Sequence, residues 1–126
     1  MTNTETTQPL RDIVTRVDHA RGAVLVGPDG LVQDKHGLGQ DDAEQVAATA
    51  HGMWSLARNT GHHFDGGEVR QILVEMDDVF LLVVSKGFTQ IAVLADSEAD
   101  VGMLAYEAAS AAEQIHAGLQ APAVSQ

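Results

Sequence analysis

The sequence contains no cysteine among its 126 residues. Disulfide bridges, thiolate metal sites and cysteine nucleophiles are therefore excluded, and the composition suits a reducing cytoplasm. The first eight residues have neither the basic start nor the apolar core of a signal peptide. The longest apolar run, residues 79–84, is far shorter than the roughly 20 residues of a membrane-spanning helix. We therefore expect a cytoplasmic protein that does not insert directly into a membrane.

Positive charge is also scarce. Seven Lys and Arg stand against eighteen Asp and Glu, which gives a formal net charge of −11. The seven bases are scattered along the chain and form no visible basic patch, so nucleic acid is not an expected partner. The acidic surface either favours a positively charged partner face or only keeps a small protein soluble.

Motifs for nucleotide binding and acyl transfer are missing as well. The sequence has no Gly-x-Ser-x-Gly nucleophile motif and no P-loop. Gly37-Leu38-Gly39 precedes a predicted helix, but the third glycine of a dinucleotide loop is absent and a hairpin strand comes before it. No cofactor is therefore expected.

The remaining candidates for chemistry are isolated polar clusters. His62-His63-x-Asp65 could form part of a zinc or nickel site, but the third ligand would have to come from elsewhere, and a solvated loop is the preferred interpretation. Asp77, Asp78 and Glu75 are interpreted as solvated acids near a turn. Arg58 and Arg70 invite comparison with an arginine finger. None of these residues is assigned a catalytic or metal-binding role, and the protein is not expected to be an enzyme.

Both ends of the chain lack the apolar residues needed for packing. We expect disordered tails at residues 1–8 and 120–126, and one domain at residues 9–119. Pro9 opens a predicted amphipathic helix, and Gly22 is predicted to stop it. Its apolar residues recur at helical spacing: Leu10, Ile13, Val14 and Val17.

A hairpin and a long helix are predicted next. The apolar runs Ala23–Gly27 and Leu31–Asp34 flank the turn residues Pro28-Asp29-Gly30. The acid-x-x-Glu spacing in Asp41–Glu44 predicts a capping box. An apolar stripe then continues to a predicted end near residues 59–61: Ala43, Val46, Ala47, Ala50, Met53, Trp54 and Ala57.

Three strands and a last helix complete the pattern. The strands are predicted at Glu68–Met76, Val79–Ser85 and Thr89–Ala95, and their short connections require antiparallel pairing. Ser97 is the predicted cap of a helix that ends at Gly118. The order α-β-β-α-β-β-β-α predicts an α/β (α+β) sandwich, with a five-stranded mainly antiparallel sheet and helices packed on it.

This order and the local sequence resemble the Roadblock (dynein light chain type) family, in particular its small actinobacterial members. The resemblance covers roughly residues 9–119 and implies the Roadblock-like sandwich with helices on both faces. Four stretches carry it: Ala23–Val32, Asp41–Ala48, Ser55–Arg58, and Val93–Asp96 continuing to Gly102–Glu107.

The resemblance implies a homodimer in which the third strands pair edge to edge and the second helices lie beside each other. The third strand has few charges, so alone it would be an unprotected sheet edge. The alanines of the second helix either allow a second helix to approach or only contact their own sheet. The expected interface residues are Ala43, Ala47, Ala50, Trp54, Val69, Gln71, Leu73 and Glu75.

Relatives of this kind are similar to the gliding-motility protein that binds a small Ras-like GTPase and promotes its hydrolysis. The resemblance therefore implies a non-catalytic homodimeric regulator or adaptor of such a GTPase in bacterial signalling. The alternatives are a light-chain-like scaffold in a sensor-kinase and GTPase complex, without effect on hydrolysis, and an enzyme or metal sensor using the His62 loop. The expected partner face comprises Gln45, Thr49, Gly52, Ser55 and Arg58.

Overall fold

The computed structural model describes residues 3–120. Over this range the chain forms three helices and five strands in the predicted order, which confirms the fold class. In chain order the elements are α1 (Asn3–Arg16), β1 (Ala20–Val26), β2 (Val32–His36), α2 (Gln40–His63), β3 (Gln71–Glu75), β4 (Val79–Lys86), β5 (Thr89–Asp96) and α3 (Val101–Gln120).

The five strands form one sheet in the order β2-β1-β5-β4-β3. Every neighbouring pair is antiparallel. The predicted β1–β2 hairpin is confirmed, and so is the meander of β3, β4 and β5. This order leaves β2 and β3 at the two edges of the sheet.

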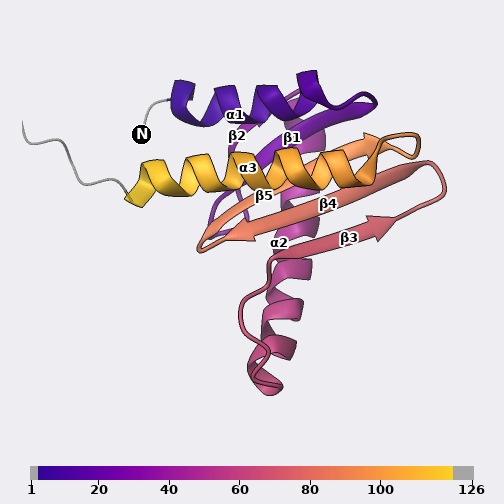
Figure 1. The fold of residues 1–126 in the computed structure, drawn as a ribbon. Helices are drawn as coiled ribbons and strands as arrows, with labels where there is room; N and C mark the ends of the chain where they lie inside the picture. Colours follow the sequence, from indigo (N-terminus) through magenta and orange to yellow (C-terminus); the bar gives the residue numbers. More distant parts are fainter. Residues whose placement is uncertain (1–2, 121–126) are drawn as a thin grey trace, which may run out of the picture.

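Helices cover both faces of the sheet, as Figure 1 shows. Helices α1 and α3 lie side by side on one face, and α2 crosses the other. The strand β4 illustrates why both faces are apolar, because Leu82 packs under α1 and α3 whereas Leu81 and Val83 pack toward α2. Alternate side chains of one strand thus fill two separate cores. None of the helices in the described range combines the length and apolarity needed to cross a membrane.

Helix α1 begins at Asn3, not at Pro9 as predicted. The expectation of a disordered tail is therefore wrong for residues 3–8, and the domain begins earlier than expected. Proline inside a helix removes one backbone hydrogen bond, so the turns before it need outside support. The hydroxyl groups of Thr6 and Thr7 provide it by donating hydrogen bonds to the carboxylate of Asp34 on β2. Of the expected C-terminal tail, residues 121–126 lie outside the described range.

Glycines are not the residues that end the helices here. The predicted stop Gly22 lies inside β1, where a Cβ atom would stand only 2.4 Å from Cγ of Leu38. The position requires glycine because the chain passes close to a side chain, not because a helix ends there. Helix α3 likewise continues past the predicted stop at Gly118 and reaches Gln120.

The helix caps also differ from the prediction. No side chain caps α2, whose N-cap residue is Gly39, and Asp41 lies in the first turn, where its charge favours the helix dipole. Asp100, not Ser97, caps α3, because its Oδ1 accepts a hydrogen bond of 3.0 Å from the backbone N–H of Met103. Helix α2 continues to His63, beyond the predicted end near residue 60.

Candidate functional site

The outer side of β3 is a free sheet edge in this chain. The carbonyl of Arg70 accepts a hydrogen bond of 2.9 Å from Ser85, and the N–H of Met76 donates one of 2.9 Å to Val79. Even-numbered residues therefore direct their backbone groups toward β4, and the odd-numbered ones direct theirs outward. The outward groups of the strand belong to Gln71, Leu73 and Glu75. The strand is shorter than predicted, since Glu68–Arg70 and Met76 lie outside it.

The side chains of β3 divide between the two faces of the sheet. Ile72 and Val74 are half-buried and pack against the core under α2. Gln71, Leu73 and Glu75 are exposed on the opposite face, with 41% of Leu73 accessible. An unpaired edge with three apolar side chains and a single charge, Glu75, is suited to pairing with another strand.

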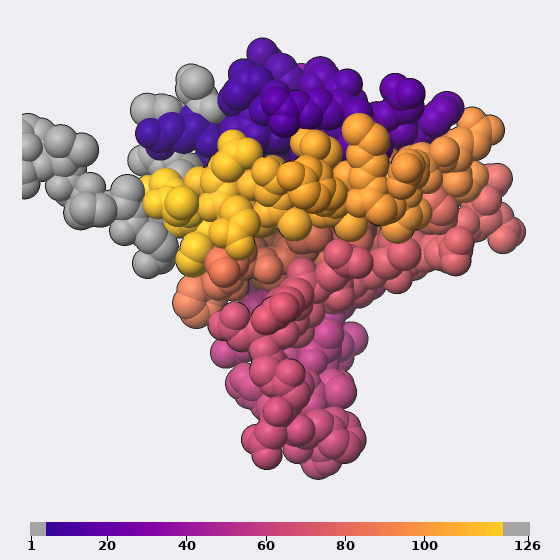
Figure 2. All heavy atoms as spheres, viewed as in Figure 1, coloured from indigo at the N-terminus to yellow at the C-terminus, as the bar shows by residue number. Residues whose placement is uncertain are grey.

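Helix α2 is longer than the sheet is wide. Its 24 residues correspond to about 36 Å, whereas five strands span about 19 Å from the first axis to the last. Its fully buried residues all lie between Ala43 and Ala50. The second half projects beyond β3, as Figures 1 and 2 show, and leaves 71% of Leu56 exposed.

The three alanines predicted for the dimer interface lie inside the chain's own core. Ala43, Ala47 and Ala50 have no accessible surface and pack with β1, β4 and β5. This corrects their assignment, because a residue without exposed surface adds no area to an interface. Their small size instead lets α2 lie close to its own sheet.

The residues predicted for partner binding all lie on α2, and one of them, Arg58, borders the pocket described below. Gln45, Gly52 and Arg58 are exposed, and Thr49 and Ser55 are partly exposed. Gln45 donates a hydrogen bond of 3.3 Å to Thr49, one turn along the helix. Arg58 carries the only charge among these five residues, so this stripe differs from the strongly acidic surface elsewhere.

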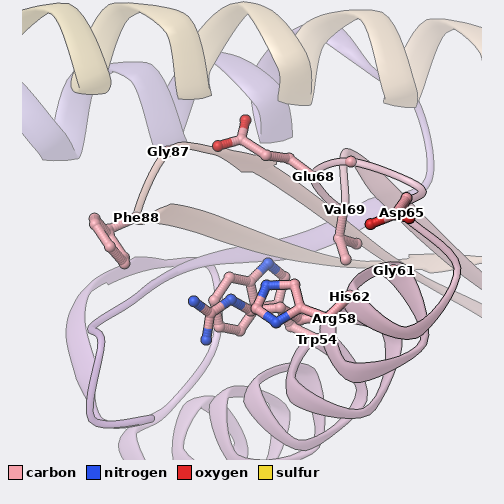
Figure 3. A pocket seen from close by; sticks show the side chains of 10 residues that line it. Trp54, Arg58, Gly61, His62, Asp65, Glu68, Val69, Gly87 and Phe88 are labelled. Carbon is pink, nitrogen blue, oxygen red and sulfur yellow. The ribbon is translucent and has the colours of Figure 1, made fainter.

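A pocket of about 690 Å³ opens between the second half of α2, the loop after it and the β4–β5 turn (Figure 3). Trp54, predicted for the dimer interface, borders this pocket and is partly buried. Val69, predicted for the same interface, lies in the loop and also borders it. The lining residues are Trp54, Arg58, Gly61, His62, Asp65, Gly67, Glu68, Val69, Gly87 and Phe88.

The polar clusters suggested by the sequence do not converge. His62 and His63 lie in the last turn of α2 rather than in a loop, both are exposed, and the His63 ring contacts Phe64 edge-on with centroids 4.7 Å apart. Asp77 and Asp78 are exposed at the β3–β4 turn. Within residues 3–120 no group of three His, Asp or Glu side chains is placed to hold a metal ion.

The sequence analysis did not identify two exposed apolar residues, one in the pocket and one on α2. Phe88 is 72% exposed at the β4–β5 turn, and Leu56 is exposed on the projecting half of α2. The exposure of Phe88 could have been predicted, because this aromatic residue lies in the short turn between two predicted strands. The exposure of Leu56 could not have been predicted from the sequence, because it depends on where the sheet ends beneath α2.

Comparison with solved structures places the fold among known domains. A Roadblock/LC7 domain from Streptomyces avermitilis superposes with a TM-score of 0.84 at 42% sequence identity, over 90% of this chain and 97% of that one. Myxococcus xanthus MglB gives a TM-score of 0.84 at 15% identity, over 98% and 95% of the two chains. At that identity the second similarity concerns the fold alone.

Sequence comparison agrees with this assignment. An uncharacterised protein of the archaeon Methanocaldococcus jannaschii is 30% identical over 104 residues, which cover 82% of this chain and 91% of the archaeal one. Residues 7–95 match the model of the Roadblock/LC7 domain. The chain therefore belongs to the Roadblock/LC7 domain family, which confirms the resemblance found in its sequence.

Proposed function

We propose that this protein is a non-catalytic homodimeric regulator or adaptor of a small Ras-like GTPase. The observation that carries the proposal is the free apolar edge of β3 beside the projecting half of α2. In a single chain the outer backbone groups of β3 have no partner strand, and the projecting half of α2 has no sheet beneath it. In a dimer, the β3 strand of the second copy would pair with this edge, and the sheet of the second copy would pack under the projecting helix.

The pattern along β3 favours one pairing register. An antiparallel pairing centred on Leu73 uses the outward backbone groups of all three odd-numbered residues and forms roughly six hydrogen bonds. It places Gln71 opposite Glu75 of the partner subunit, where an amide can donate to a carboxylate. It also places Ile72 opposite Val74 of the partner subunit on the face toward α2. A register centred on Ile72 would instead place Gln71 opposite Leu73 of the partner subunit, where its amide has no side-chain hydrogen-bond partner.

The dimer would present two copies of the α2 surface formed by Gln45, Thr49, Gly52, Ser55 and Arg58, whose only charge is that of Arg58. Family membership and the resemblance to GTPase-binding relatives support a GTPase partner in general, and we propose these five residues as its contact face. The sequence has no nucleotide motif of its own, so the protein would act only through its affinity for the partner. A binding protein shifts a partner between two states only if it binds them unequally. We therefore propose preferential binding of the GTP form.

A binding assay with a small Ras-like GTPase of the same organism tests this proposal. We expect the dimer to bind the GTP-like form at least about tenfold more tightly than the GDP form, or about 1.4 kcal/mol. Arg58→Ala should weaken binding without dissociating the dimer, whereas Arg11→Ala on α1, another exposed arginine, should leave it unchanged. Equal binding of both forms with an unchanged hydrolysis rate would instead favour the scaffold in a sensor-kinase complex.

A further inference from the structure

Within residues 3–120 no helix packs over the side of β3 that faces away from α2. Helix α3 packs on β4 and β5 rather than on β3, as Figure 1 shows. Gln71, Leu73 and Glu75 point to this side of the sheet and are exposed. A recess of about 380 Å³ lies at the boundary, where Ala109 and Ala112 of α3 border it together with Gln71.

The strand pairing proposed above would leave this side of the sheet open. A partner strand adds to the edge of β3 in the plane of the sheet, so it lies beside Leu73 and not above it. The projecting half of α2 lies on the other side of the sheet in both copies. In the dimer the two β3 strands would form the floor of a groove, and α3 of each copy would form a wall. One copy alone contains only half of this groove.

The width of the groove matches a single α-helix. Helix α3 lies over β4 and β5, so about four strand spacings, or roughly 19 Å, would separate it from α3 of the second copy. The axes of two helices in contact are about 8–10 Å apart. The gap therefore equals about two such distances, and one helix fits between the walls.

The wall that α3 presents to the groove consists of small residues. Gly102, Ala105, Ala109 and Ala112 recur at spacings of three, four and three residues, which places them on one face of the helix. This face is directed at the groove, because Ala109 and Ala112 border the recess beside β3. No side chain on it is larger than a methyl group, so a second helix can approach closely.

The charged residues around the groove are mainly acidic. Nζ of Lys86 lies 3.5 Å from Oε1 of Glu113, so one of the two bases is already paired with an acid. An excess of acids attracts a positively charged partner. The exposed charged residues of β3, its turn and the recess are the acids Glu68, Glu75, Asp77, Asp78 and Glu113 and the bases Arg70 and Lys86.

We propose that one basic amphipathic helix of a partner protein docks in this groove. Its apolar face packs on Leu73 of both copies, and its lysines or arginines point to the acidic rim. The two-fold axis of the dimer passes through the groove, so one helix binds per dimer. The groove rests on the proposed dimer but not on the proposed GTPase, whose contact face is on α2.

Synthetic peptides test the proposal on the full chain. The probe is a fluorescent peptide of about eighteen residues, long enough to form a helix, with leucine along one face and lysine and alanine elsewhere. One control peptide has the same composition with the leucines distributed around the helix, and another has glutamate in place of lysine. We expect fluorescence anisotropy to show binding of the probe at least about tenfold tighter than of either control, with one peptide per dimer.

A matched pair of variants locates the binding. Ala109→Trp fills the groove from its wall and should weaken binding of the probe at least about tenfold. Gln114→Trp places the same side chain about 140° around α3, where residue 114 is exposed, and should leave the affinity unchanged. Light scattering verifies that both variants have the same mass as the unaltered protein.

Equal binding of the probe and the control with distributed leucines would overturn the proposal, because charge alone would then explain the affinity. Unchanged affinity in Ala109→Trp, or two peptides per dimer, would also contradict it. A dimer to which the probe does not bind would exclude the groove alone. A protein that is monomeric at all concentrations would exclude both the dimer and the groove.

Discussion

The hydroxyl Oγ1 of Thr7 donates a hydrogen bond of 2.7 Å to Oδ2 of Asp34, twenty-seven positions further along the chain. Thr6 donates to the same oxygen atom, and the other carboxylate oxygen accepts a hydrogen bond of 2.8 Å from the backbone of Lys35. One carboxylate on β2 thus anchors the turns of α1 that precede Pro9.

Replacing this carboxylate should loosen the start of α1. We expect Asp34→Ala to lower the free energy of unfolding by about 1–3 kcal/mol, because two partly buried hydroxyl groups lose a charged acceptor. Hydrogen exchange should become faster in residues 3–9 and stay unchanged in β4. Asp42→Ala, which removes an exposed carboxylate on α2, is the control. Unaltered protection of residues 3–9 in Asp34→Ala would contradict the anchoring role.

A charge on the free edge of β3 should prevent dimer formation. Light scattering of the unaltered protein should give twice the chain mass at micromolar concentration. Leu73→Glu would place two carboxylates opposite each other at the symmetry axis, and we expect it to weaken the dimer at least about hundredfold, or about 2.8 kcal/mol. Leu31→Glu is the control, since Leu31 is 65% exposed on the β1–β2 turn. A monomer in the unaltered protein at all concentrations would remove the dimer proposal.

Single cysteines should reveal the pairing register. The chain has no native cysteine, so any disulfide comes from the introduced residue. In the register centred on Leu73, Leu73→Cys places two sulfur atoms within reach, because opposed Cα atoms of a hydrogen-bonded pair lie about 5.5 Å apart. Gln71→Cys alone should not cross-link, but it should do so when mixed with Glu75→Cys. Efficient cross-linking of Gln71→Cys with itself would contradict this register.

Metal ions should not bind tightly at the end of α2. His62 and His63 are both exposed, and within residues 3–120 no third ligand is placed to complete a metal site with them. Calorimetry with Zn²⁺ should find no site tighter than about 10 μM, which corresponds to roughly −7 kcal/mol. Stoichiometric binding far tighter than this, lost in His62→Ala, would favour the metal-sensor alternative.

The fold was predictable because its cores follow simple periodicities. Leu10, Ile13 and Val17 recur at helical spacing, and all three are buried in the core that α1 forms. The errors lie where contacts distant in sequence decide the outcome. Local sequence predicts a helix start at Pro9, because the hydrogen bonds from Thr6 and Thr7 to Asp34 cannot be inferred from it.

The candidate site was only partly predictable for the same reason. The free edge at Leu73 could be inferred, because a nearly uncharged strand indicates pairing on an edge. The sequence could not show what the alanines of α2 contact, since small residues allow close packing against the chain's own sheet as well as against a second helix. The pocket could not be predicted, because Trp54 and Phe88 are 34 positions apart and border one space only in the folded chain.

The opposite edge of the sheet sets a limit on assembly. Strand β2 has five residues, as β3 does, but it carries three ionisable side chains, Asp34, Lys35 and His36, whereas β3 carries only Glu75. Short, charged edges resist the addition of further strands. If two copies pair through β3, each has used its one apolar edge and exposes only β2 at the ends of the joint sheet. Association by strand pairing then closes at two copies and does not grow into a fibre.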